Sequence, residues 1–207
     1  MYLYETHSHS SQCSACAKSP SRELVRAYHD AYLEAKEEGD KLDFDVIFGI
    51  EHAYGSGKEV LLYGIDLEFL LKNDDIRRIS LGELADRVRA YGGLVIMAHP
   101  YRDRSYVDMS VGPQEEVLDG IELYNACNAP GEDLQALPLA ERNPRYILTS
   151  GGDIHHHADP RIGAAGLWFH RRIRDGKELV EALKAGDYQF QVGSEKLPRI
   201  EAKHLGG

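Results

Sequence analysis

The stretch Tyr2-Leu3-Tyr4-Glu5-Thr6-His7-Ser8-His9 begins as an apolar strand and ends in two histidines separated by one residue. In an extended strand the side chains at positions i and i+2 point to the same face, so His7 and His9 are expected to project together. Two converging imidazoles form half of a site for a first-row metal ion. Because His-x-His also occurs on solvated strand faces, the rest of the chain must decide between the two interpretations.

Three later apolar segments also end in residue types that bind metal ions. Where strands alternate with helices, chemistry gathers at the carboxyl ends of the strands. Each of these residues alone could be a helix cap, a core histidine or a turn residue, but together they indicate one site. Imidazole and carboxylate ligands without thiolate suit Zn, Mn or Fe, and a carboxylate can bridge two ions. The candidate metal ligands are His7, His9, Glu51, His99, Asp153 and His155.

Helical and strand patterns alternate along the chain. Apolar residues recur at helical spacing from Ser21 to about Glu38, and Gly39 is expected to end that helix. Ser80 and Glu83 form a capping-box pattern that opens a helix to about Tyr91. Further helices are expected near 132–142 and 177–185, and strands at 2–4, 44–50, 60–65, 94–98, 119–124, 146–148, 165–169 and 188–192. This alternation predicts an α/β fold of βα units with a parallel sheet or barrel.

Size and composition narrow the class of protein. With 207 residues the chain can bury a substantial core, and we expect residues 1–207 to form one metal-binding domain. A net charge of −10 and the lack of a basic run argue against nucleic-acid binding. No secretory signal and no membrane span are visible, and the three cysteines do not suggest a disulfide framework, so a cytoplasmic protein is predicted. Cys13-Ser14-Ala15-Cys16 could bind zinc but is interpreted as a loop.

Five short motifs follow one another in a fixed order along nearly the whole chain: Thr6-His7-Ser8-His9, Gly49-Ile50-Glu51, Ala98-His99-Pro100, Gly120-Ile121-Glu122 with Asn125, and Ser150-Gly151-Gly152-Asp153-Ile154-His155. Together they resemble the PHP (polymerase and histidinol phosphatase) domain. The resemblance implies a distorted seven-stranded β/α barrel that holds up to three metal ions and hydrolyses phosphoesters. It also implies that the six candidate ligands bind metal with Glu51 bridging, that Arg102 binds phosphate, and that Asn125 is a weaker candidate ligand.

Two departures from the family pattern change these expectations. Gln12 stands where such proteins usually carry an acidic residue or histidine, and an amide oxygen brings no charge to offset that of the ion. The second strand of the family, which ends in Asp-His, has no counterpart here. We therefore expect a barrel truncated by one strand region, through natural loss or an incomplete sequence, with one or two ions. His52, His156 and His157 are spare imidazoles that could compensate, although solvated positions are favoured for them.

The predicted function is that of a metal-dependent phosphoesterase acting on a small phosphorylated substrate, with activity weakened by the truncation. Metal-activated water would attack the ester, with Asp153, His155 and Arg102 as catalytic residues, and His155 or His99 could protonate the leaving oxygen. Two alternatives stay open: a non-catalytic protein that binds metal or a phosphorylated ligand, and a metal-dependent amidohydrolase, which would need a strand-end lysine. Uncovered strand edges would also favour a homo-oligomer.

Overall fold

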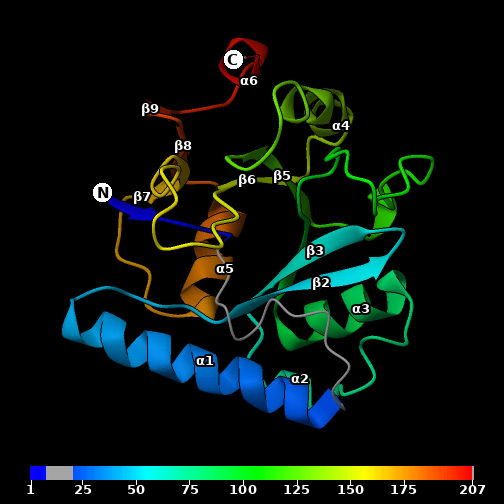
Figure 1. The fold of residues 1–207 in the computed structure, drawn as a ribbon, viewed down its shortest axis with the longest axis vertical. Helices are drawn as coiled ribbons and strands as arrows, with labels where there is room; N and C mark the ends of the chain where they lie inside the picture. The colour runs from blue at the N-terminus through cyan, green and yellow to red at the C-terminus, as the bar shows by residue number, and fades with distance from the viewer. Residues whose placement is uncertain (8–20, 207) are drawn as a thin grey trace.

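The computed structural model describes residues 1–7 and 21–206, which form a mixed α/β fold with two sheets (Figure 1). The five-stranded sheet has the order β2 (Gly49–Gly55), β3 (Lys58–Tyr63), β4 (Leu94–Met97), β5 (Gly120–Asn125) and β6 (Ile147–Gly151). The four-stranded sheet has the order β1 (Tyr2–Tyr4), β7 (Ala165–Phe169), β8 (Tyr188–Val192) and β9 (Glu195–Leu197).

The strand directions do not form the expected parallel barrel. The strands β4, β5 and β6 are parallel, whereas β2, β3 and β4 pair antiparallel, as do all pairs of the second sheet. The two-residue turn Ser56-Gly57 explains why β2 and β3 are antiparallel. So short a connection forms a hairpin, whereas parallel strands need a crossover of about a dozen residues. The α/β class is therefore confirmed, but the described residues do not show the expected distorted, truncated (β/α)7-type barrel and instead form two sheets that do not close.

The two sheets meet beside β6. The hydroxyl of Ser150 in β6 donates a hydrogen bond to the carbonyl oxygen of Gln191 in β8 and accepts one from Gly166 N in β7. Thr6, just after β1, donates from its hydroxyl to the Ser150 carbonyl oxygen. Its own carbonyl oxygen accepts a hydrogen bond of 2.8 Å from the hydroxyl of Tyr63 in β3. These bonds bring the end of β1 next to β6 and β3, although β1 belongs to the other sheet.

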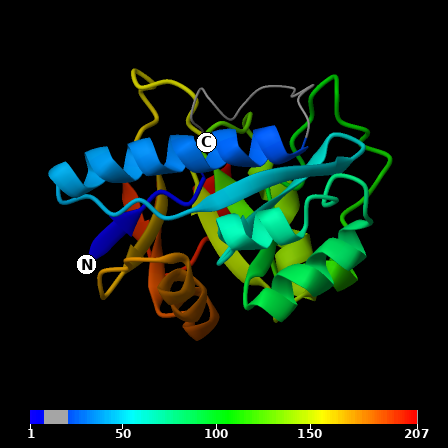
Figure 2. The ribbon, with the colours of Figure 1, turned by 90° about the horizontal axis from the view of Figure 1, so that it is seen from below.

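Helices cover the faces of this core (Figures 1 and 2). Half of the capping box predicted for α3 is confirmed: the Ser80 side chain accepts a hydrogen bond from Glu83 N, and Gly92 ends the helix in the left-handed conformation. The Glu83 carboxylate, which a capping box would direct to Ser80 N, instead accepts a hydrogen bond from Arg87. Buried residues of α3 lie against β4, and α5 packs near β3. No helix in residues 21–206 is long and apolar enough to cross a membrane. The helices are α1 (Ser21–Lys41), α2 (Leu67–Lys72), α3 (Leu81–Tyr91), α4 (Leu137–Arg142), α5 (Gly176–Ala185) and α6 (Ala202–Leu205), with 3-10 turns η1 (Glu115–Val117) and η2 (Asp133–Ala136).

The segment between α1 and β2 corrects two predictions. Gly39 does not end the helix, because α1 continues to Lys41. Instead, its carbonyl oxygen accepts hydrogen bonds from Leu42 N and Phe44 N, so the chain folds back closely over the glycine. Residues 44–48 were expected in a strand but lie outside β2, and Phe44 is 62% exposed. Ile47 and Phe48 are partly buried against the core, so this apolar run packs without being part of the strand.

The strand expected at 60–65 is also shifted. The observed β3 begins at Lys58 and ends at Tyr63. Asp66, which directly follows the expected strand, caps α2, where its side chain accepts a hydrogen bond from Phe69 N. The shift moves Glu59 into the strand, where it becomes part of the candidate site.

Candidate metal centre

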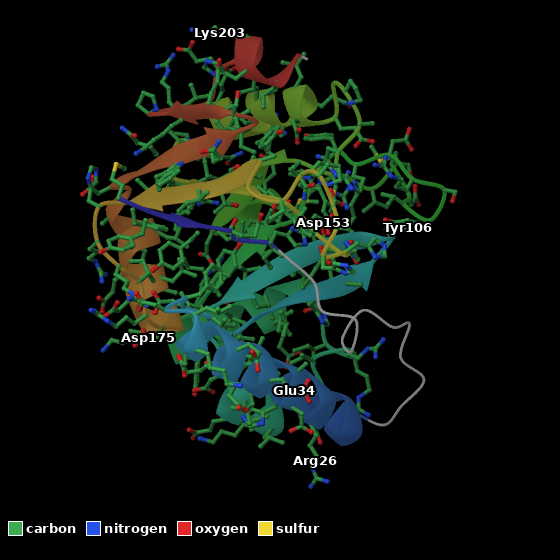
Figure 3. The ribbon with its side chains drawn as sticks, turned by 60° about the vertical axis from the view of Figure 1, so that its left-hand side comes forward. Arg26, Glu34, Tyr106, Asp153, Asp175 and Lys203 are labelled. Carbon is green, nitrogen blue, oxygen red and sulfur yellow. The ribbon has the colours of Figure 1, made fainter. Side chains whose placement is uncertain are left out.

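Potential metal ligands in or just after five strands converge on one region. His7 follows β1, His99 follows β4 and Asp153 follows β6, as expected, and Figure 3 shows Asp153 near the hairpin of β2 and β3. Two groups of side chains there bring their ligand atoms within 4.8 Å of one another: His7 with His99 and Asp153, and Glu51 with Glu59 and His99. The structure therefore places four of the six predicted ligands together: His7, Glu51, His99 and Asp153.

Glu51 lies between the two buried imidazoles. Its Oε1 atom is 3.2 Å from His7 Nε2 and 3.0 Å from His99 Nε2. The two rings are stacked with their centroids 5.7 Å apart, and Asp153 Oδ1 lies 3.5 Å from His7 Nε2. A carboxylate in this position suits the bridging role that the family resemblance implies.

Glu122 is a site residue to which the sequence analysis gave no role. It is completely buried, and its carboxylate lies 3.1 Å from His7 Nδ1. His99 N and Asn125 Nδ2 both donate hydrogen bonds to its Oε2 atom. A carboxylate on Nδ1 orients the imidazole and directs Nε2 to the metal side, as outer partners of metal-binding histidines do. The sequence does contain a signal for this role: Glu122 is an acidic residue between apolar neighbours within the strand β5. A buried carboxylate in such a strand needs polar partners.

Glu59 is the second site residue to which the sequence patterns gave no role. Its Oε2 atom lies 3.5 Å from His99 Nε2, and its side chain is 25% exposed. Burial, and then repulsion by Glu51, raise the pKa of Glu59 above its ordinary value. The sequence predicts a strand that begins at Val60, which places Glu59 outside it.

Glu5 connects the strand that carries His7 to the turn that carries Asp153. Its Oε1 atom accepts hydrogen bonds from His7 N and Gly152 N. Its Oε2 atom is buried and has no hydrogen-bond partner among the described residues. Burial raises the pKa of Glu5 to about 7. A side chain on Gly152 would collide with this carboxylate, which explains the glycine there.

Two candidate ligands have a strained backbone. His99 has a φ of +29° and Asp153 a φ of +56°, in the region that non-glycine residues seldom adopt. Asp153 N donates a hydrogen bond to the carbonyl oxygen of His7, which helps to hold the turn. Such conformations persist only where surrounding contacts enforce them, and they cluster at functional sites.

Arg102 is buried and pairs with Asp153. Its Nη1 atom donates a hydrogen bond of 2.5 Å to Asp153 Oδ2, Nη2 donates to Asn125 Oδ1, and Nε donates to Asn128 Oδ1. Burial opposes the charge of the guanidinium, but Asp153 outweighs it and raises the pKa of Arg102. Arg102 thus lies beside the candidate ligands, as predicted, with its three nitrogens directed at protein oxygens.

The remaining candidate residues either belong to neither donor group or lie outside the described residues. His155 is exposed and belongs to neither donor group, and its Nδ1 atom is 2.8 Å from the Asp153 carbonyl oxygen. His156 and His157 are also exposed, whereas His52 is buried, and burial lowers its pKa to about 4. These spare histidines likewise belong to neither group. His9, Gln12, Cys13 and Cys16 lie outside the described residues.

The donor atoms and charges of the described site fit a divalent metal ion. Burial opposes a charge on His7, but Glu122 and Glu51 outweigh it and raise the pKa of His7 well above its ordinary value. The carboxylates thus attract a proton to a ring that a metal would use as a neutral ligand. Several buried carboxylates around two imidazoles require positive charge, and a divalent ion would supply it.

No protein-family model matches this sequence, and no curated protein matches it. A two-domain protein from Bacteroides vulgatus that contains a predicted PHP-like metal-dependent phosphoesterase matches 92% of this chain, with 14% identity and a TM-score of 0.56. This chain spans 57% of that protein. A candidate metal-dependent phosphoesterase from Bifidobacterium adolescentis matches 86% of this chain and 94% of its own length, with 14% identity and a TM-score of 0.49. The likeness to the Bacteroides structure shows a PHP-like fold.

Proposed function

We propose that this chain is a metal-dependent phosphoesterase that acts on a small phosphorylated substrate. The observation that carries the proposal is the position of Glu51, whose carboxylate oxygen lies between His7 Nε2 and His99 Nε2 at 3.2 and 3.0 Å. The PHP-like fold, and the predicted phosphoesterase in the matching Bacteroides protein, support the same class of reaction. Zn, Mn or Fe ions are the proposed cofactors, because imidazole and carboxylate donors suit them.

The proposed ligands are His7, Glu51, His99 and Asp153, with Glu51 bridging when two ions are bound. When bound, the ions would activate water and neutralise the phosphoryl oxygens. The protein supplies orientation: Glu122 fixes the ring of His7, and Glu5 ties His7 to the turn before Asp153. This preorganisation matters because a site held in place in advance need not rearrange during reaction.

His155 is the proposed proton donor to the leaving oxygen. Its Nδ1 atom contacts the Asp153 carbonyl oxygen, so the protonated ring would keep Nδ1–H on that oxygen and pass on the Nε2 proton. Arg102 is proposed to bind a phosphoryl oxygen. In the structure its guanidinium holds Asp153, so that role requires it to exchange at least one protein partner for substrate.

The ion pair between Arg102 and Asp153 favours the second candidate function, which is binding of metal or of a phosphorylated ligand without turnover. A buried Arg102–Asp153 pair neutralises a proposed ligand, and breaking such a pair is costly. The amidohydrolase alternative is less favoured, because the buried Lys58 directs its Nζ to the Pro100 carbonyl oxygen and Met109 sulfur.

A hydrolysis assay separates these functions. The protein would be tested with an aryl phosphate and a panel of phosphorylated metabolites after loading with Mn²⁺ or Zn²⁺. We expect turnover that a chelator abolishes and that Asp153→Asn reduces by about a thousandfold, as expected for lost electrostatic stabilisation. Bound metal without turnover on any phosphoester would establish the binding function instead.

A further inference from the structure

The hairpin of β2 and β3 carries two carboxylates on one face. In the register of the hairpin Glu51 lies opposite Leu61, and Glu59 lies two residues before Leu61 on the same strand. Because strand side chains alternate between faces, Glu51 and Glu59 therefore project to the same side. Diagonal neighbours of this kind are about 7–8 Å apart at the backbone, within reach of two long side chains.

Both carboxylates converge on one nitrogen of a buried histidine. His99 Nε2 lies 3.0 Å from Glu51 Oε1 and 3.5 Å from Glu59 Oε2, and the residue is only 6% exposed. The ligand atoms of the three side chains lie within 4.8 Å of one another. Like charges on neighbouring strands are destabilising unless a cation lies between them.

We propose that Glu59 is a metal ligand and that Glu51, Glu59 and His99 together hold an ion at the hairpin. The inference rests on the proposed metal-dependent function and adds a ligand that the sequence motifs did not contain. One imidazole nitrogen binds one ion, so His99 serves the hairpin ion. His7 and Asp153 serve the other ion, and Glu51 lies between the two.

The donor set also indicates the class of ion. The hairpin set has two carboxylates and one imidazole, and such oxygen-rich sites suit Mn²⁺. A protonated His99 could also hold two carboxylates in place without a metal. Removing the charge of Glu59 distinguishes a bound metal ion from a protonated His99. Only the arrangement with a bound ion predicts that this change releases an ion.

The test counts Mn²⁺ ions bound to the full chain. Metal-free protein is titrated with Mn²⁺ alone, free Mn²⁺ is followed by its electron paramagnetic resonance signal, and bound metal is verified by elemental analysis. We expect two ions per chain for the wild type. In Glu59→Gln, the second ion should be lost or bind at least tenfold more weakly. Glu195→Gln, which changes an exposed carboxylate in β9, should bind two ions like the wild type.

Equal Mn²⁺ counts and affinities for the wild type and Glu59→Gln would overturn the proposal, as would a wild-type chain that binds no Mn²⁺. Thermal unfolding of the metal-free forms checks that the variant folds. If it does not fold, anomalous diffraction from Mn²⁺-loaded wild-type crystals decides: an ion that contacts Glu59 supports the proposal, and bound ions without that contact refute it. The count is independent of turnover, so a loss of the ion in a protein without phosphoesterase activity would support Glu59 and reject the proposed reaction.

Discussion

The two halves of the five-stranded sheet build the candidate site in different ways. In the parallel half, His99 and Asp153 follow the ends of β4 and β6. In the hairpin half, Glu51 is the third residue of β2 and Glu59 the second of β3. The carboxyl ends of parallel strands share an edge, so strand ends reveal donors there. In a hairpin, neighbouring strands run in opposite directions, and the register decides which side chains meet.

The two halves of the sheet also differ in how the negative charge of their carboxylates is compensated. In the parallel half, Arg102 pairs with Asp153, while Glu122 accepts hydrogen bonds from His99 N and Asn125 and lies against His7. His7 outweighs the effect of burial and lowers the pKa of Glu122. In the hairpin half, burial and Glu51 raise the pKa of Glu59. The hairpin half therefore has the greater need for a cation.

The substitution with the largest expected effect is His99→Ala, because both hairpin carboxylates converge on His99 Nε2. The hairpin ion should be lost entirely. Since ligands that bind only the folded state stabilise it, the rise in Tm on adding Mn²⁺ should be strongly reduced. Thermal unfolding with and without Mn²⁺ measures this effect, with the exposed His170→Ala as a control. A Tm rise like that of the wild type would show that His99 is not a ligand.

Glu122→Gln tests mainly the parallel half, because Glu122 lies against His7 Nδ1. It removes the negative charge that orients His7 while keeping an oxygen that can accept hydrogen bonds from His99 N or Asn125. Loss of such an outer partner typically weakens metal binding by about 10–100-fold. Metal titration should show this loss at the ion held by His7 and a smaller change at the hairpin ion. Equal weakening of both ions would show that the halves are not separable.

Gly151→Ala tests how closely the parallel half is packed. An added Cβ would collide with Glu122 Oε1 and His7 Cβ, so we expect a stability loss at the upper end of about 1–3 kcal/mol. At Gly112 an added Cβ meets no atom within 4 Å, so Gly112→Ala is the matched control and should be neutral or slightly stabilising. Denaturant unfolding compares the two variants. Equal stabilities would mean that the turn before Asp153 can shift freely.

Asp133→Asn gives the smallest expected effect. It tests a carboxyl group outside the two donor groups, to which amide groups of two asparagine residues donate hydrogen bonds. Burial raises the pKa of Asp133 from 3.8 to about 7, although Asn128 Nδ2 and Asn125 N both donate to its Oδ1. Because the folded state keeps a proton that the unfolded state releases, wild-type stability should fall as pH rises from about 4 to 7.

Asparagine keeps the accepting oxygen and cannot ionise. The stability of Asp133→Asn relative to the wild type should therefore increase between pH 5 and pH 7, by roughly 1–2 kcal/mol. Unfolding curves at several pH values measure this difference. A difference that stays constant with pH would show that Asp133 keeps an ordinary pKa in the folded protein.

Local patterns were sufficient for elements whose ends are determined within a few residues. The helix α3 begins after Ser80 and ends at Tyr91 as predicted, because the Ser80 cap and the left-handed Gly92 act on the adjacent turns. The same kind of rule failed at Gly39, where the chain after the helix, and not the residue itself, decides where the helix ends.

The sequence by itself identified His7, Glu51, His99 and Asp153 as candidate ligands of one site, because their residue types and their places in ordered motifs are visible without coordinates, and the structure brings them together. Only the tertiary structure decided the direction of β2 and β3, the open arrangement of the two sheets, and the roles of Glu5, Glu59 and Glu122. The physical reason is that strand direction, register and burial arise from contacts between segments far apart in the chain. No single segment encodes them.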